Sequence, residues 1–147
     1  MNQSTTIRWW IIFCVQLLIV ALSVYMGLWT HIWTTDATYL SFIIMSIWFV
    51  NSIIMGFYLI TNRDMDRLLP VGWFVSEVCL SLGMLGTVAG FLIMLVTVFG
   101  SIDVSNTETL REAISNMALG MGTALYTTLI GIVANLFIKI QLVNSES

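Results

Sequence analysis

Long runs of apolar residues alternate with short polar stretches along the sequence. Four of these runs reach or exceed the roughly twenty residues that an α-helix needs to cross a lipid bilayer. They extend over residues 7–29, 39–61, 72–99 and 113–142. The pattern therefore predicts an all-α, polytopic membrane protein with four transmembrane helices, in which residues 1–147 form a single membrane domain.

The polar stretches between the runs contain signals for helix ends. Pro70 fits the start of the third helix, because the first helical turn does not use the N–H group that proline lacks. The letters S-N-T-E at residues 105–108 resemble a capping box. They predict a short helix at about residues 105–112 that lies on the outer membrane surface before the fourth span.

The charged residues predict how the helices are oriented. A basic residue, Arg8, precedes the first run as in a signal peptide, but the run is as long as a full crossing and no A-x-A-like site follows it. We therefore expect a retained first helix and four crossings, which place both termini on one side of the membrane. Cytoplasmic termini satisfy the positive-inside rule, because only Arg111 would then lie outside. The basic residues on the cytoplasmic side would be Arg8, Arg63, Arg67 and Lys139.

Composition supports the membrane assignment and excludes several functions. Hydrophobic residues make up 59% of the chain and charged residues 9%, and the mean hydropathy is +0.96. The basic residues do not cluster, so nucleic acid is not an expected partner. Cys14 and Cys79 both lie in apolar runs, where we expect them to be packing residues, because a metal site would need closely grouped ligands. We find no phosphate-binding loop and no nucleophile–base pair, and we expect neither an enzyme nor a cofactor or metal site.

Two segments rich in small and hydroxylic residues interrupt the apolar runs. They read L-G-M-L-G-T-V-A-G at residues 82–90 and M-G-T-A-L-Y-T-T-L-I-G at residues 121–131. In lipid, small residues allow helix backbones to approach closely, and polar side chains join helices by hydrogen bonds. We therefore expect the third and fourth helices to pack against each other through Gly83, Gly86, Gly90, Gly131 and Asn135.

Hydroxyl groups lie inside both segments. Thr87 and Thr128 each lie about fifteen residues into their helix, which at 1.5 Å per residue places both near the membrane midplane. Thr123 and Thr127 flank the second of them. Facing hydroxyls at one depth can coordinate a cation or line a narrow wet path. The alternative is that each hydroxyl bonds its own i−4 carbonyl or holds two helices together.

The pair G-M-L-G-T-V-A-G and A-L-Y-T-T-L-I-G resembles the two pore-lining helices of the MotA/TolQ/ExbB ion-channel family. The resemblance implies a stator-type subunit of the bacterial inner (cytoplasmic) membrane that couples H+ or Na+ flow to mechanical work. It implies a homopentamer around a dimer of single-span MotB-, ExbD- or TolR-like subunits, which carry the ion-binding aspartate. Thr87 and Thr128 would be the pore hydroxyls, with Thr127 and Thr123 beside them.

The sequence departs from this family at two places. A MotA-type subunit has a long charged segment between its second and third spans, whereas only residues 62–71 connect them here. Direct contact with a flagellar rotor is therefore not expected. Thr123 occupies a position where ExbB-like proteins have a glutamate, so the coupling ion stays open.

Glu77 is the only acidic residue well inside a predicted span. It lies about one turn from Trp73, near the expected cytoplasmic edge, where it could reach the interface, pair with Arg67, or form a cytoplasmic ion exit. It also supports an alternative function, a small four-helix proton-coupled transporter that works as a dimer. A non-conducting membrane scaffold is the third possibility.

Overall fold

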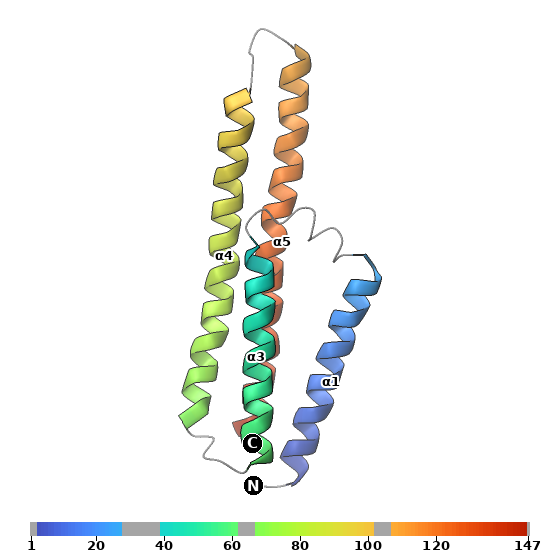
Figure 1. The fold of residues 1–147 in the computed structure, drawn as a ribbon, viewed down its shortest axis with the longest axis vertical. Coiled ribbons are helices and arrows are strands. Elements are labelled where there is room, and N and C mark those ends of the chain that lie inside the picture. Colours follow the sequence, from blue (N-terminus) through green and yellow to red (C-terminus); the bar gives the residue numbers. More distant parts are fainter. Residues whose placement is uncertain (1–2, 28–38, 62–66, 102–106, 147) are drawn as a thin grey trace.

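The computed structural model describes residues 3–27, 39–61, 67–101 and 107–146. Its helices are α1 (Gln3–Tyr25), α3 (Leu40–Ile60), α4 (Leu68–Ser101) and α5 (Thr107–Glu146) (Figure 1). Within these ranges no residue is in a β-strand. All four helices are long and apolar enough to cross a membrane, which confirms the predicted all-α fold with four spans.

The helix ends agree with the predicted spans to within a few residues, with one correction. Pro70 lies in the first turn of α4, as predicted, and Gly27, at a φ of 79°, follows the end of α1. The predicted surface helix, however, is not a separate element: residues 107–112 are the first turns of α5, and residues 105–106 lie outside the described ranges. No glycine or proline interrupts residues 107–112. Glu108 in the first turn stabilises the helix, because its negative charge lies at the positive end of the helix dipole.

The helices α4 and α5 form a long antiparallel hairpin that organises the molecule. Their contact is the most extensive between any two helices, and it keeps one register along its length. Close pairs along the hairpin are Gly72 with Leu142, Gly83 with Gly131, Gly90 with Ala124, and Met94 with Gly120. In the structure, α4 and α5 therefore pack against each other through small residues.

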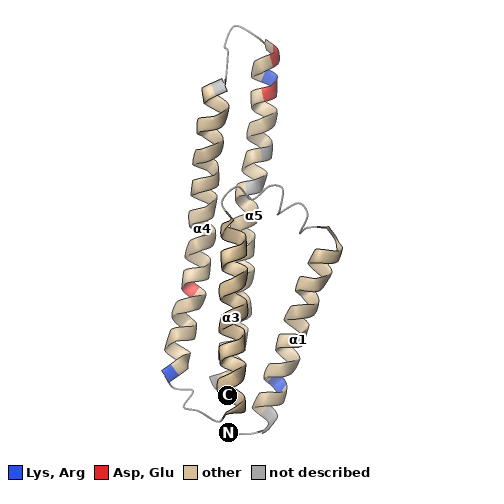
Figure 2. Ribbon diagram, in the orientation of Figure 1, with Lys and Arg blue, Asp and Glu red and all other residues tan. Residues whose placement is uncertain are grey.

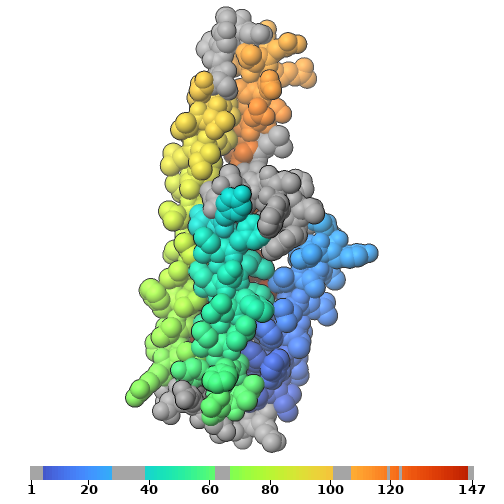
Figure 3. Space-filling model, viewed as in Figure 1, coloured from blue at the N-terminus to red at the C-terminus, as the bar shows by residue number. Residues whose placement is uncertain are grey.

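The helices α1 and α3 cover only part of this hairpin (Figures 1 and 3). Leu40, the first residue of α3, lies beside Gly86 of α4, since its Cδ1 is 3.3 Å from the position that a Cβ on Gly86 would take. Beyond this level α4 and α5 continue without α3 or α1 beside them. The molecule thus has a four-helix part and a two-helix part, and Gly86 lies at the boundary.

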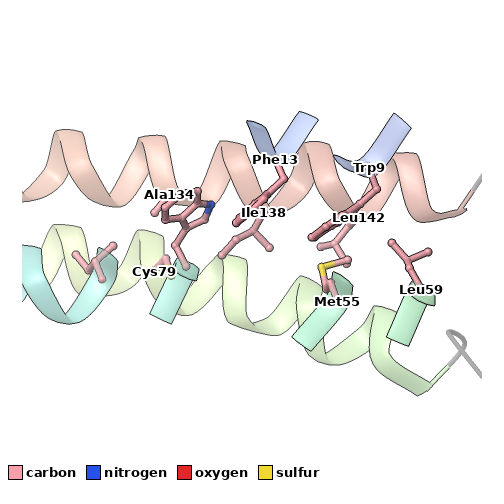
Figure 4. Close-up of a cluster of buried hydrophobic side chains, with 10 residues drawn as sticks. Trp9, Phe13, Met55, Leu59, Cys79, Ala134, Ile138 and Leu142 are labelled. Carbon is pink, nitrogen blue, oxygen red and sulfur yellow. The ribbon is translucent and has the colours of Figure 1, made fainter. Parts of the chain in front are cut away.

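An apolar cluster holds the four-helix part together (Figure 4). Trp9 and Phe13 of α1 stack with ring centroids 5.3 Å apart, and the ring of Trp9 lies directly on Gly56 of α3. From α5, Ile138 and Leu142 enter the same cluster. Large side chains thus pack against small ones, the arrangement by which helices associate in lipid.

A buried hydrogen-bond network also connects three of the helices, and the sequence analysis did not identify it. Ser52 Oγ of α3 donates to Gln141 Oε1 of α5 at 3.0 Å, and Gln141 Nε2 donates to Gln16 Oε1 of α1 at 2.5 Å. Gln16 Nε2 then donates to the carbonyl of Phe137 at 3.0 Å. Because polar groups in lipid must be satisfied within the protein, this network fixes α1 and α3 against α5.

Charged residues of the described chain gather toward the helix ends (Figure 2). Arg8 lies near the start of α1 and Arg67 immediately precedes α4, whereas Glu108, Arg111 and Glu112 lie in the first turns of α5. Between them the helices expose large apolar side chains to their surroundings. An apolar exterior around helices of spanning length is typical of a multi-pass membrane protein.

Candidate ion site between α4 and α5

The backbones of α4 and α5 touch at Gly83 and Gly131. A Cβ on Gly131 would lie 2.8 Å from Gly83 Cα and 2.9 Å from the carbonyl oxygen of Cys79. Because such distances are shorter than those of real Cβ contacts, neither position has room for a side chain. Gly90 is less tight, since its Cβ would lie 3.3 Å from the Cβ of Ala124. The closest approach of the two helices is therefore made by main-chain atoms.

Next to this contact, the hydroxyls of Thr87 and Thr128 form a hydrogen bond with each other. Thr87 Oγ1 also lies 3.1 Å from the carbonyl oxygen of Gly83 and 3.2 Å from that of Ala124. Thr128 Oγ1 lies 3.3 Å from the same Gly83 oxygen. Two hydroxyl oxygens and two carbonyl oxygens, contributed by both helices, thus converge at one point.

This group of oxygens has the chemistry of a cation or proton site. Hydroxyl and carbonyl oxygens are ligands of hard cations, and a hydroxyl pair can reverse its direction of donation. The two side chains are half-buried rather than sealed, so the group is accessible to a partner or to water. The i−4 bond of Thr87 to Gly83 is also present, so the hydroxyls join the helices as well.

The pair lies near the middle of both long helices, and its depth at the membrane midplane stays a prediction. It lies, however, level with the first residue of α3, because Gly86 is next to Leu40. The site is therefore at the boundary where the four-helix part of the molecule gives way to the two-helix part.

Of the two flanking threonines, Thr127 packs its methyl group between the helices. Thr127 is 2% exposed, and its Cγ2 methyl and Cβ pack on Gly86, so that its methyl group fills the helix interface. The side chain of Thr123 lies outside the part of the chain that the structure describes.

A second polar contact joins the same two helices nearer the end of the chain. Lys139 Nζ of α5 donates to Glu77 Oε1 of α4 at 2.8 Å, and Nζ lies 5.6 Å from the centre of the Trp73 ring. The expected pairing of Glu77 with Arg67 is therefore wrong. Arg67 immediately precedes α4, the helix of Glu77, whereas the observed partner lies on α5. The register between two helices cannot be read from one sequence.

Asn135 also differs from expectation. We expected it to form a hydrogen bond between helices, but its Oδ1 is buried and has no hydrogen-bond partner within the described ranges. The residue is 8% exposed and lies one turn from Gly131 on α5. An amide oxygen without a donor in such a place is costly and requires an explanation.

The fold and this site define a multi-pass membrane protein with a polar contact between two long, closely packed helices. A family model described as the MotA/TolQ/ExbB proton channel family matches residues 60–143, which is more than half of the chain. The chain belongs to this family, and the match includes all of α4 and nearly all of α5. Comparisons with curated proteins and with solved structures gave no significant match.

Proposed function

We propose that this chain is the ion-conducting subunit of a stator-type motor complex in the bacterial inner membrane. Five copies would surround a dimer of single-span MotB-, ExbD- or TolR-like partners, with both termini of each copy in the cytoplasm. Flow of H+ or Na+ down its gradient would then drive mechanical work. The observation that carries this proposal is the Thr87–Thr128 pair at the crossing of α4 and α5, within the segment that matches the family.

In this mechanism the threonine pair receives the ion from a carboxylate of the partner. Thr87 and Thr128 each offer an oxygen to an incoming cation, and the carbonyl of Gly83 accepts a hydroxyl hydrogen while the other hydroxyl turns. The main-chain contact at Gly131 holds the two hydroxyls at a fixed spacing, so the exchange requires no rearrangement of the site itself.

The uncovered outer half of the hairpin supports an assembly of several chains. On α4 beyond the level of α3, the large apolar side chains of Phe91, Leu92, Val96 and Phe99 are all exposed. A ring of copies around a partner would cover part of this apolar surface.

The alternative of a small transporter with Glu77 as its ion-binding carboxylate is disfavoured. The Glu77 side chain is 58% exposed, and Lys139 neutralises it directly. A carboxylate that binds and releases a proton for transport is expected in an enclosed cavity without a permanent cationic partner.

The proposal is tested by replacing each hydroxyl with a methyl group, in Thr87→Val and Thr128→Val. Thr97→Val is the matched control, because Thr97 is an exposed threonine of α4 that bonds only its own helix, at Ile93. The complex, purified from its native membrane in mild detergent, is counted by native mass spectrometry and reconstituted into liposomes for ion-flux measurement. We expect five copies in every variant, and loss of flux only in Thr87→Val and Thr128→Val.

Two results would contradict the proposal. If Thr87→Val or Thr128→Val prevents assembly, these hydroxyls hold helices together rather than handle ions. If the complex contains two copies, the ring is wrong and Glu77 becomes the residue to study.

A further inference from the structure

The buried Oδ1 of Asn135, which has no donor in the described part of the chain, points to a bound molecule that the protein itself does not supply. A second buried asparagine shows the contrast: Asn51 is equally buried, at 8% exposure, yet its Nδ2 donates to Met55 Sδ at 3.7 Å. Nothing in the packing around Asn135 therefore satisfies an oxygen that lies in the membrane region.

The register of the hairpin shows what Asn135 faces. Gly131 and Leu142 of α5 contact Gly83 and Gly72 of α4, respectively. At 100° per residue, Asn135 lies on the same face of α5 as these two residues. Asn135 is between these two contacts, so its side chain is directed at α4. By this register Cys79 of α4 lies opposite Asn135. One turn before it on α4, Ser76 is fully buried and donates its own hydrogen to the carbonyl of Trp73 at 2.7 Å. Its oxygen is left as an acceptor.

Asn135 is also placed between the two polar contacts of the hairpin. At 1.5 Å per residue it lies about 10 Å along the axis from Thr128 and about 6 Å from Lys139. Lys139 would repel a cation if it were alone, but its ion pair with Glu77 neutralises it. The polar groups thus follow one another from Thr87–Thr128 to Asn135 and then to Glu77.

We propose that Asn135 is a further residue of the ion path, and that its Oδ1 holds a water molecule between the threonine pair and the Glu77–Lys139 pair. This inference rests on the proposed ion-conducting function. The water donates one hydrogen to Oδ1 and keeps its other hydrogen and its lone pairs for neighbours such as Ser76. A proton then arrives at this water from the threonine side while another leaves toward Glu77. For Na+, the same water and Oδ1 would be ligands. Asn135 itself is neither protonated nor deprotonated in either case.

The hydration is tested directly on the complete complex in phospholipid vesicles. Asparagine is labelled with ¹⁵N, and water-edited solid-state NMR records which side-chain amides receive magnetisation from water. The Asn135 signal is assigned by its absence in Asn135→Leu. We expect Asn135 to receive magnetisation from water and Asn51 to receive none. A dry Asn135 overturns the inference, whatever the complex conducts.

Ion flux then tests the role of this water. Asn135→Leu removes the oxygen at similar volume, whereas Asn135→Ser keeps an oxygen and leaves room for a second water. We expect Asn135→Leu to lower flux about tenfold, the effect of losing one hydrogen bond to a charged species, and Asn135→Ser to restore most of it.

The outcomes separate this inference from the function on which it rests. If Asn135→Leu conducts normally while Thr87→Val does not, the proposed function stands and the role of Asn135 is refuted. If neither variant changes flux, both proposals fail.

Discussion

Lys139 of α5 and Glu77 of α4 are joined by an ion pair of 2.8 Å in the same two helices that carry the threonine pair. Their side chains are 32% and 58% exposed, respectively, and Lys139 also lies over the ring of Trp73. Since exposed ion pairs contribute little to stability, this pair is better placed to affect a passing ion than to hold the fold together.

Glu77→Gln is therefore expected to separate activity from stability. The free energy of unfolding should change little, because the pair lies outside the buried core of the protein. Ion flux should fall, because the carboxylate at the proposed exit is lost. Flux in liposomes and thermal unfolding in detergent measure the two effects. Lys139→Gln is the companion variant, and unchanged flux in Glu77→Gln would remove Glu77 from the path.

Gly131→Ala should destabilise the protein, because its Cβ would meet Gly83 Cα at 2.8 Å and the carbonyl of Cys79 at 2.9 Å. Separating two backbones is expected to cost about 1–3 kcal/mol, as overpacking does elsewhere. Thermal unfolding monitored by circular dichroism measures the loss. Gly122→Ala is the matched control on the same helix, because nothing lies within 4 Å of its Cβ position. There alanine should stabilise the helix by about 0.5–1 kcal/mol, and equal losses in both variants would refute the close contact.

Thr127→Val should leave ion flux unchanged, although Thr128→Val at the next position should abolish it. Thr127 uses its methyl group, which packs on Gly86 and which valine retains. Thr128 uses its hydroxyl, which valine lacks. The two variants are nearly identical in volume and in effect on helix propensity, so flux measured side by side isolates the hydroxyl. Loss of flux in both would place Thr127 in the path, as the family resemblance implies.

Gln141→Leu should loosen α1, because it leaves Gln16 Oε1 and the Ser52 hydroxyl without their partner in a buried site. We expect a loss of about 1–2 kcal/mol in unfolding free energy. The double variant Gln16→Leu/Gln141→Leu should recover part of it, since fewer polar groups are then unpaired. Ser46→Ala serves as the control, because Ser46 is exposed and bonds only to Phe42 of its own helix. A double variant less stable than Gln141→Leu would contradict this reading of the network.

The sequence was sufficient to predict the features that depend on local pattern. Apolar runs gave the four spans, because bilayer thickness dictates the length of a spanning helix. The glycines and threonines gave the packed faces of α4 and α5, because small residues in lipid have one main use. The opposition of Thr87 and Thr128 followed from their equal distance from the helix ends.

Features that depend on the register between helices could not be predicted. Arg67 was one possible partner of Glu77 among the alternatives that the sequence left open, and a lysine distant in sequence pairs with Glu77 instead. The network of Gln16, Ser52 and Gln141 joins residues from three helices, and no spacing along one helix marks it. The presence of polar residues inside the predicted apolar spans would have given a first indication of this network.

The main-chain contact of Gly83 with Gly131 is a point about which α4 and α5 can rotate against each other. Because no side chain intervenes there, the spacing of the two backbones cannot be adjusted by a rotamer change and alters only if one whole helix turns on the other. A rotation of about 5° around this pivot would move the far end of α4, about 27 Å away at 1.5 Å per residue, by about 2 Å. Any change at the threonine pair that turned one helix by this angle would therefore displace the free end of the hairpin by about 2 Å.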